Sequence, residues 1–189
     1  MAIPADIANA LLGAWRLARF DRGGLAFFEH GEAAFWRSFR AALIIYPAFL
    51  LLLALRLGDA EWQAADLPRI LLVETIGYVI AWVAFPLLMV PTTRFLGREH
   101  LWIDFIIVYN WSQILQYGLF LFVTGLAQSA LLPESLAAGM VSAATVAVLV
   151  YEWFIARVTL DIAGPAAAMI VLVDLVLGAV ISRVAELMH

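Results

Sequence analysis

Four carboxylates lie within or beside long apolar stretches of this chain: Glu74, Asp104, Glu152 and Asp174. Placing a charged side chain at the centre of a membrane helix costs roughly 2.5–3.5 kcal/mol, so such groups face a partner or a wet cavity. Carboxylates inside a membrane protein also serve as relays that pass protons or cations along a path. Asp174 lies nearest the middle of its apolar stretch and is the deepest of the four.

The neighbours of Asp174 on a helical wheel are small. At 100° per residue, these small neighbours and Asp174 fall within an arc of about 80°. They predict a helix-packing face that contains Gly164, Ala167, Gly178 and Ser182. Small residues let helix backbones approach closely, so this face should carry Asp174 into a bundle.

A second polar stripe lies in the third apolar stretch, where Asn110, Gln113 and Tyr117 share one helix face. Two interpretations are open. The stripes could form hydrogen bonds between helices that fix the order of the bundle. They could also line a path for protons or cations, with Glu74, Glu152 and Asp174 as relays.

No catalytic or metal-binding motif accompanies these groups. His30, His100 and His189 are scattered and outside any His-Glu-x-x-His pattern. Nucleophile-elbow, phosphate-loop, dinucleotide-binding and Gly-x-Gly-Asp patterns are also absent. Because the chain has no cysteine, thiol nucleophiles and Cys-ligated metals are excluded. We therefore expect a protein that is not an enzyme and that holds no metal or cofactor.

The composition predicts a membrane protein. Of the 189 residues, 65% are hydrophobic and only 14% are charged, and the mean hydropathy is +0.97. Only helices and closed barrels satisfy their backbone in lipid, and these apolar runs do not alternate as barrel strands would. The expected fold class is an all-α, polytopic membrane bundle. A net charge of −4 without a basic stripe argues against a nucleic-acid partner.

Five stretches are long enough to span a bilayer, which takes about 20 apolar residues. They are predicted near 36–57, 69–93, 101–127, 135–159 and 164–186. Residues 35–189 then form a transmembrane domain, and residues 1–34 form a cytoplasmic or interfacial segment. The connections fall near 58–68, 94–100, 128–134 and 160–164.

The N-terminal segment is predicted to contain an amphipathic helix. One of its sides carries Ile7, Ala8, Leu11, Ala14, Trp15 and Ala18. Asp6, Asn9 and Arg16 lie opposite, a pattern that fits a helix on the surface of the membrane. The alternative is a cap that packs on the bundle.

Arginine placement predicts the orientation, because cytoplasmic loops carry an excess of basic residues. With the N-terminus inside, eight arginines are cytoplasmic and three lie on the other side. Trp36, Trp62, Trp102 and Trp153 fall near predicted helix ends, where tryptophan anchors at the interface. The chain contains arginine but no lysine, which suits a high-GC bacterial genome. We expect a multi-pass protein of the bacterial inner membrane with a periplasmic C-terminus.

The layout resembles the Yip1-like membrane proteins, which have a cytoplasmic N-terminal segment followed by five closely spaced spanning helices. The similarity runs from Phe35-Trp36-Arg37 through Tyr46-Pro47 and Gly77-Tyr78 to the last helix. The Asp-Leu-Tyr-Gly-Pro type motif of eukaryotic members is absent, so no functional residue is transferred. The resemblance implies a non-catalytic bundle that works through protein or lipid contacts.

Two functions are therefore expected from the sequence. The first is a scaffold or accessory subunit whose partners are membrane lipids and another membrane protein or a second copy of the chain. The second is a small transporter or channel subunit with a polar path through Asp174, Glu152 and Glu74.

Overall fold

The computed structural model describes residues 4–57, 66–129 and 131–188, and every regular element in these ranges is a helix. Trp62, His189 and most of the predicted 58–68 connection lie outside them. The elements are α1 (Ala5–Ala18), η1 (Arg22–Phe27), α2 (Glu32–Ser38), α3 (Arg40–Arg56), α5 (Leu67–Phe95), η2 (Glu99–Leu101), α6 (Trp102–Gln128), α7 (Glu134–Thr159) and α8 (Gly164–Glu186).

Five helical stretches are long and apolar enough to cross a membrane: α2 with α3, α5, α6, α7 and α8. This confirms the prediction of an all-helical fold with five helices that could span a membrane. The first stretch begins at Glu32 and is interrupted at Phe39, where α2 gives way to α3. The second runs through Pro86 and Pro91 without a break in the helix.

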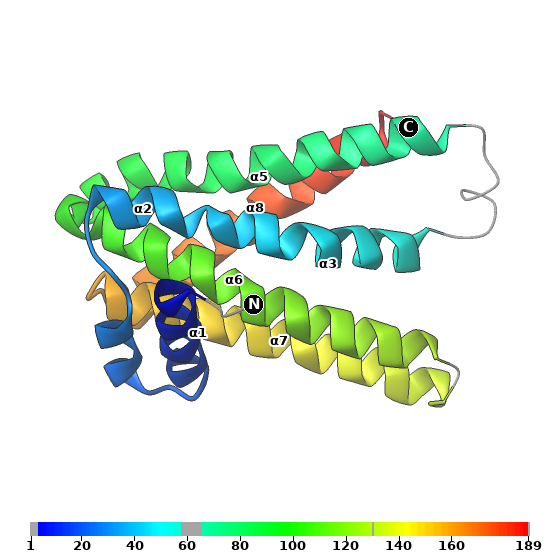
Figure 1. Cartoon of the computed structure of the whole chain (residues 1–189), viewed down its shortest axis with the longest axis horizontal. Helices are drawn as coiled ribbons and strands as arrows, with labels where there is room; N and C mark the ends of the chain where they lie inside the picture. Colours follow the sequence, from blue (N-terminus) through cyan, green and yellow to red (C-terminus); the bar gives the residue numbers. More distant parts are fainter. Residues whose placement is uncertain (1–3, 58–65, 130, 189) are drawn as a thin grey trace.

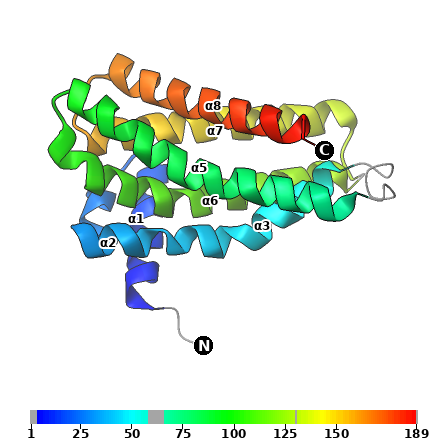
Figure 2. The same cartoon turned by 90° about the horizontal axis from the view of Figure 1, so that it is seen from above.

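The long helices run along a common axis and alternate in direction (Figures 1 and 2). The N-terminal segment, the α5–α6 turn and the α7–α8 turn lie at one end of the bundle, and the C-terminus lies at the other. Helix α6 packs between α3 and α7, while α8 contacts both α7 and α5. The four helices α5, α6, α7 and α8 thus surround one region of the bundle.

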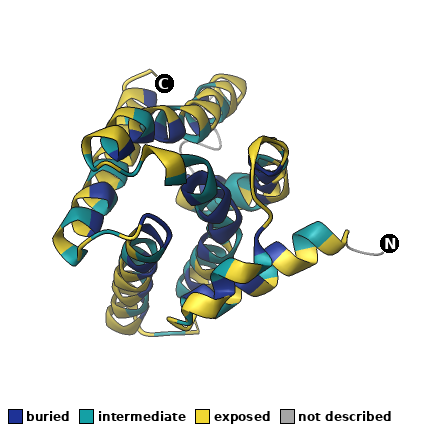
Figure 3. Cartoon of the chain, turned by 90° about the vertical axis from the view of Figure 1, so that its left-hand side faces the viewer, coloured by how far each residue is buried: buried dark blue, intermediate teal, exposed yellow. Residues whose placement is uncertain are grey.

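The core follows α6, where Phe105, Ile106, Ile107 and Val108 are buried. Viewed along the bundle, buried residues face inward and exposed ones lie mainly on the outside (Figure 3). The outer residues include large apolar side chains such as Leu43 and Phe122. Such a surface suits hydrocarbon as its solvent, since lipid does not penalise exposed apolar groups.

Helix α1 crosses the bundle and packs on α6 and α7. The Tyr151 hydroxyl donates a hydrogen bond to the Ala14 carbonyl over 2.8 Å. The face against the bundle is Ala10, Gly13, Ala14 and Leu17. The apolar side expected from the helical wheel meets the bundle only in part. Ala14 is buried and Ile7 and Ala18 pack against the core, whereas Trp15 remains 55% exposed. Helix α1 therefore packs on the bundle, as the alternative interpretation of the sequence described.

A tight turn holds η1 against α1. Asp21 accepts hydrogen bonds from the Arg16 side chain (2.6 Å) and from the Gly23 amide (2.8 Å). These two donors, Arg16 first, hold the pKa of Asp21 below its ordinary value. The backbones meet closely here, because a Cβ on Gly24 would lie 2.6 Å from the Gly13 carbonyl oxygen.

We predict that Gly24→Ala separates η1 from α1, at a cost of about 1–3 kcal/mol, because the added methyl group meets backbone that cannot give way. A lower thermal midpoint and faster proteolysis of the N-terminal segment in detergent would report this. Gly139→Ala is the matched control, since a Cβ there meets nothing within 4 Å. Equal midpoints for both variants would show that the close approach is not present.

Candidate functional site

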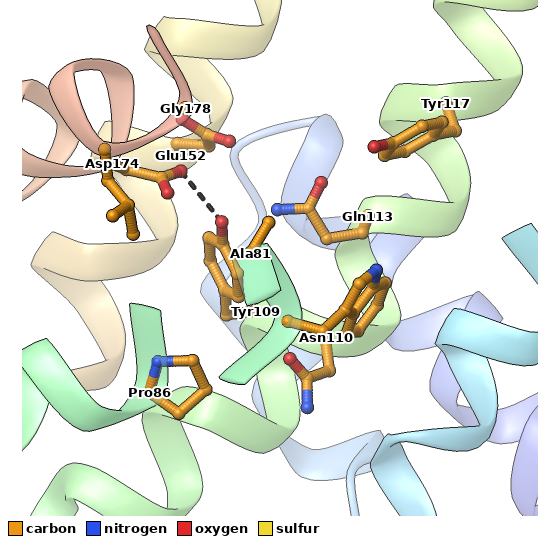
Figure 4. Close-up of a pocket in the computed structure, with 11 residues that line it drawn as sticks. Ala81, Pro86, Tyr109, Asn110, Gln113, Tyr117, Glu152, Asp174 and Gly178 are labelled. Atoms are coloured by element: carbon orange, nitrogen blue, oxygen red, sulfur yellow. Dashed lines mark hydrogen bonds between the residues drawn. The ribbon is translucent and has the colours of Figure 1, made fainter. Parts of the chain in front are cut away.

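A cavity of about 200 Å³ lies between α5, α6, α7 and α8 (Figure 4). Of the seven intramembrane polar candidates expected from the sequence, five line it. These are Asn110, Gln113, Tyr117, Glu152 and Asp174. The rest of the lining is Ala81, Trp82, Pro86, Tyr109, Leu177 and Gly178. None of the described residues in this lining is basic.

Helix α6 supplies most of the polar lining because Tyr109, Gln113 and Tyr117 recur every four residues, which places them on one face. Gln113 and Tyr117 reach toward the carboxylates of Glu152 and Asp174 (Figure 4). Three side chains from α6 therefore face one carboxylate from α7 and one from α8, while the Asn110 side chain points away from them (Figure 4).

Asn110 joins the cavity to the core. It is 1% exposed, and its Nδ2 donates to the Ser38 hydroxyl of α2 over 2.8 Å. Ser38 in turn donates to the Phe35 carbonyl. The other amide atom, Oδ1, is buried without a hydrogen-bond partner in the described structure. An unsatisfied buried acceptor is costly, but almost none of the surface of this oxygen is accessible, so it does not face the open space of the cavity.

Asp174 is fixed by one hydrogen bond. The Tyr109 hydroxyl donates to its Oδ2 over 2.8 Å, and the Tyr109 ring stacks on Phe85 with centroids 4.3 Å apart. Glu152 lies near enough to Asp174 and to Gln116 for electrostatic interaction with both. The two carboxylates are thus neighbours on different helices, and Tyr109 presents a donor to one of them.

The cavity lies in the half of the bundle that contains the N-terminal segment. Tyr109 is seven residues from the start of α6 and Glu152 is seven from the end of α7, which places both about 10 Å from those helix ends. Trp102 and Trp153 lie nearer the ends, and their indoles donate to the carbonyls of Pro86 and Gly164. The polar site is therefore further from the helix ends than these tryptophans.

Two predicted polar candidates lie elsewhere. Glu74 pairs with Arg56 between α5 and α3, outside the cavity. Asp104 accepts a hydrogen bond from His30 Nδ1 over 2.9 Å at the end of α6. The polar path predicted from the sequence included Glu74, which lies outside the cavity, so the carboxylates of that path in the cavity are Glu152 and Asp174.

The predicted packing face of α8 is only partly in contact with its own chain. Gly164 lies against the Trp153 ring and Ala167 is fully buried, whereas Gly178 and Ser182 are exposed. Helix α8 crosses from α7 to α5, so its contact side changes along its length. Near its end, Ile181 packs on α5 at Gly77 instead.

Sequence reasoning missed Tyr109, Trp82 and Gln116. Tyr109 lies four residues before Gln113, a spacing that places both on one face. Gln116 is 4% exposed, and its Nε2 has no hydrogen-bond partner in the described structure. No group of three or more histidine, aspartate or glutamate side chains that could hold a metal occurs among the described residues.

We predict that a cysteine at Gly178 reacts with water-soluble methanethiosulfonates in intact membranes, because Gly178 is exposed and also lines the cavity. The chain has no native cysteine to interfere. A cationic reagent should react about tenfold faster than an anionic one, since the carboxylates attract it. Val176→Cys, on the opposite side of α8, should stay inert in hydrocarbon, where no thiolate forms. Equal labelling by the two reagents would contradict a negative cavity.

Comparison of the chain with protein-family models, with curated proteins and with solved structures gives no match.

Proposed function

We propose that this chain is a small transporter or channel subunit that takes a proton or a positively charged solute into the cavity between α5, α6, α7 and α8. The observation that carries the proposal is that Glu152 and Asp174 line one cavity whose described lining contains no basic residue. Two carboxylates close together in a medium of low dielectric constant repel each other when ionised. A proton or a cation relieves this repulsion.

The size of the cavity favours this function over hydrogen bonding for packing alone. Polar contacts that only join helices leave little empty space, because protein interiors are close-packed. A cavity of about 200 Å³ is larger than the engineered 150 Å³ cavity that binds benzene. Its polar lining suits water or a polar solute rather than an empty void.

The weak packing of α8 supports access to the cavity. Gly178 lines the cavity, is exposed, and has no atom within 4 Å of the position of a Cβ. Helix α8 is also the least buried of the five candidate spans. Movement of α8 relative to α6 would widen the entrance to the cavity beside Gly178 without breaking a tightly packed interface.

We further propose a bacterial inner-membrane location with the N-terminus in the cytoplasm. Arg94 and Arg98 lie at the α5–α6 turn and Arg157 ends α7. These join the arginines of the N-terminal segment at one end of the bundle. An excess of basic residues favours the cytoplasmic side.

The second candidate is an accessory subunit or scaffold, the function that the Yip1-like resemblance implies. It is favoured by the part of α8 around Gly178 and Ser182, which is exposed and which none of the described helices covers. A helix of another membrane protein, or of a second copy, would pack closely on such small residues. A partner bound there would be lost with Ser182→Leu, whereas solute flux would not require Ser182.

Proteoliposomes with a potential-sensitive dye should test the transport function. When a proton or sodium gradient is imposed across the membrane, we expect ion flux through the wild type to change the membrane potential that the dye reports. Asp174→Asn should reduce the rate of this change about tenfold, because the cavity loses one charge. Asp104→Asn is the matched control, since Asp104 pairs with His30 outside the cavity. Equal, negligible flux in wild type and Asp174→Asn would overturn the proposal for these ions.

A further inference from the structure

Aromatic rings share the cavity with the two carboxylates. Trp82 of α5 and Tyr109 and Tyr117 of α6 all belong to its lining. The face of an aromatic ring is electrostatically negative and attracts cations, most strongly where water is excluded. Proteins recognise substituted ammonium ions with this combination of aromatic rings, often with a carboxylate nearby.

The hydrogen-bonding groups of the cavity also suit an ammonium ion. The carboxylate oxygens of Glu152 and Asp174 are acceptors and belong to its lining. Every one of these atoms accepts a hydrogen bond or attracts positive charge. A solute with a cationic head would interact with both carboxylates.

The volume indicates an organic ion rather than a bare metal ion. A cavity of about 150 Å³ holds benzene, so the observed volume of about 200 Å³ corresponds to roughly six to eight non-hydrogen atoms. A bare divalent ion needs six or more oxygens within about 2.6 Å. Two carboxylates in so large a space do not provide that shell, and no metal-binding cluster occurs among the described residues.

We infer that the cavity lined by Trp82, Tyr117, Glu152 and Asp174 binds a small organic ammonium ion, with its charge between the carboxylates and its alkyl groups against the aromatic rings. This inference rests on the proposed function, since it names the class of cation that the cavity takes. Tyr109 holds Asp174 toward this space through its hydroxyl group. Tyr117 is an aromatic contact.

Calorimetric titration of the purified protein in nanodiscs tests the inference with two probes of the same shape. Choline carries a trimethylammonium group, and its neutral carbon analogue carries a tert-butyl group in the same place. We expect choline to bind the wild type at least about tenfold more tightly than the analogue, because only choline interacts with the carboxylates and ring faces. Equal affinities would overturn the inference.

Variants separate the rings from the charges. Tyr117→Leu should weaken choline binding about tenfold, while Tyr117→Phe should retain most of it because the ring remains. Asp174→Asn should weaken it by a similar factor. Equal binding by Tyr117→Leu and Tyr117→Phe would overturn the aromatic contribution. The comparison of the two probes uses the wild type and does not depend on the folding of any variant.

The outcome also separates this inference from the proposed function. If choline does not bind but proton or sodium flux depends on Asp174, the ammonium ion is the wrong class and the transport function stands. If choline binds without any flux of protons, sodium or choline, the site is supported and transport is overturned. If neither binding nor flux is found, both fail.

Discussion

Lipid offers no hydrogen bonds, and this constraint determines how the polar side chains of the chain are arranged. Helix α6 carries polar side chains such as Tyr109, Asn110 and Gln113 within a mainly apolar span, so these groups must find partners inside the bundle. Tyr109 finds Asp174 on α8, and Asn110 finds Ser38 on α2. The order of helices around α6 follows from these contacts together with its apolar core.

The same constraint distinguishes the cavity from an ordinary interface. On its other sides α6 packs closely through residues such as Ile106 and Ile107. Toward α5 and α8 the packing stops short, and two carboxylates face the remaining space. Polar groups left partly unsatisfied in a bundle are expensive, so their presence beside empty volume is the physical basis for a binding site.

The Yip1-like resemblance stays a prediction.

Much of the architecture was predictable, because the length and composition of the apolar runs suffice to identify spanning helices. The polar stripe of α6 and the position of Asp174 could also be derived, since a helical wheel describes one helix well. It does not identify the opposing helix. Glu74 was therefore grouped with Glu152 and Asp174, although it pairs with Arg56 on α3.

Other misses have the same origin. Small residues contribute to the buried face of α1, so the apolar side of the helical wheel overlaps this face only at Ile7, Ala14 and Ala18. Gly178 and Ser182 continue the small face of α8, but α8 crosses toward α5 before they meet a helix. Tyr109 was missed because its ring resembles an apolar residue in a hydropathy pattern, while its hydroxyl group provides the contact.

The central claim is that Asp174 faces inward toward α6 rather than outward to lipid. A double-mutant cycle with Tyr109→Phe and Asp174→Asn, measured as free energies of unfolding in bicelles, tests this contact directly. The structure predicts a coupling energy of about 0.6–1.7 kcal/mol, the range found for hydrogen bonds between membrane helices. Strictly additive effects would contradict it.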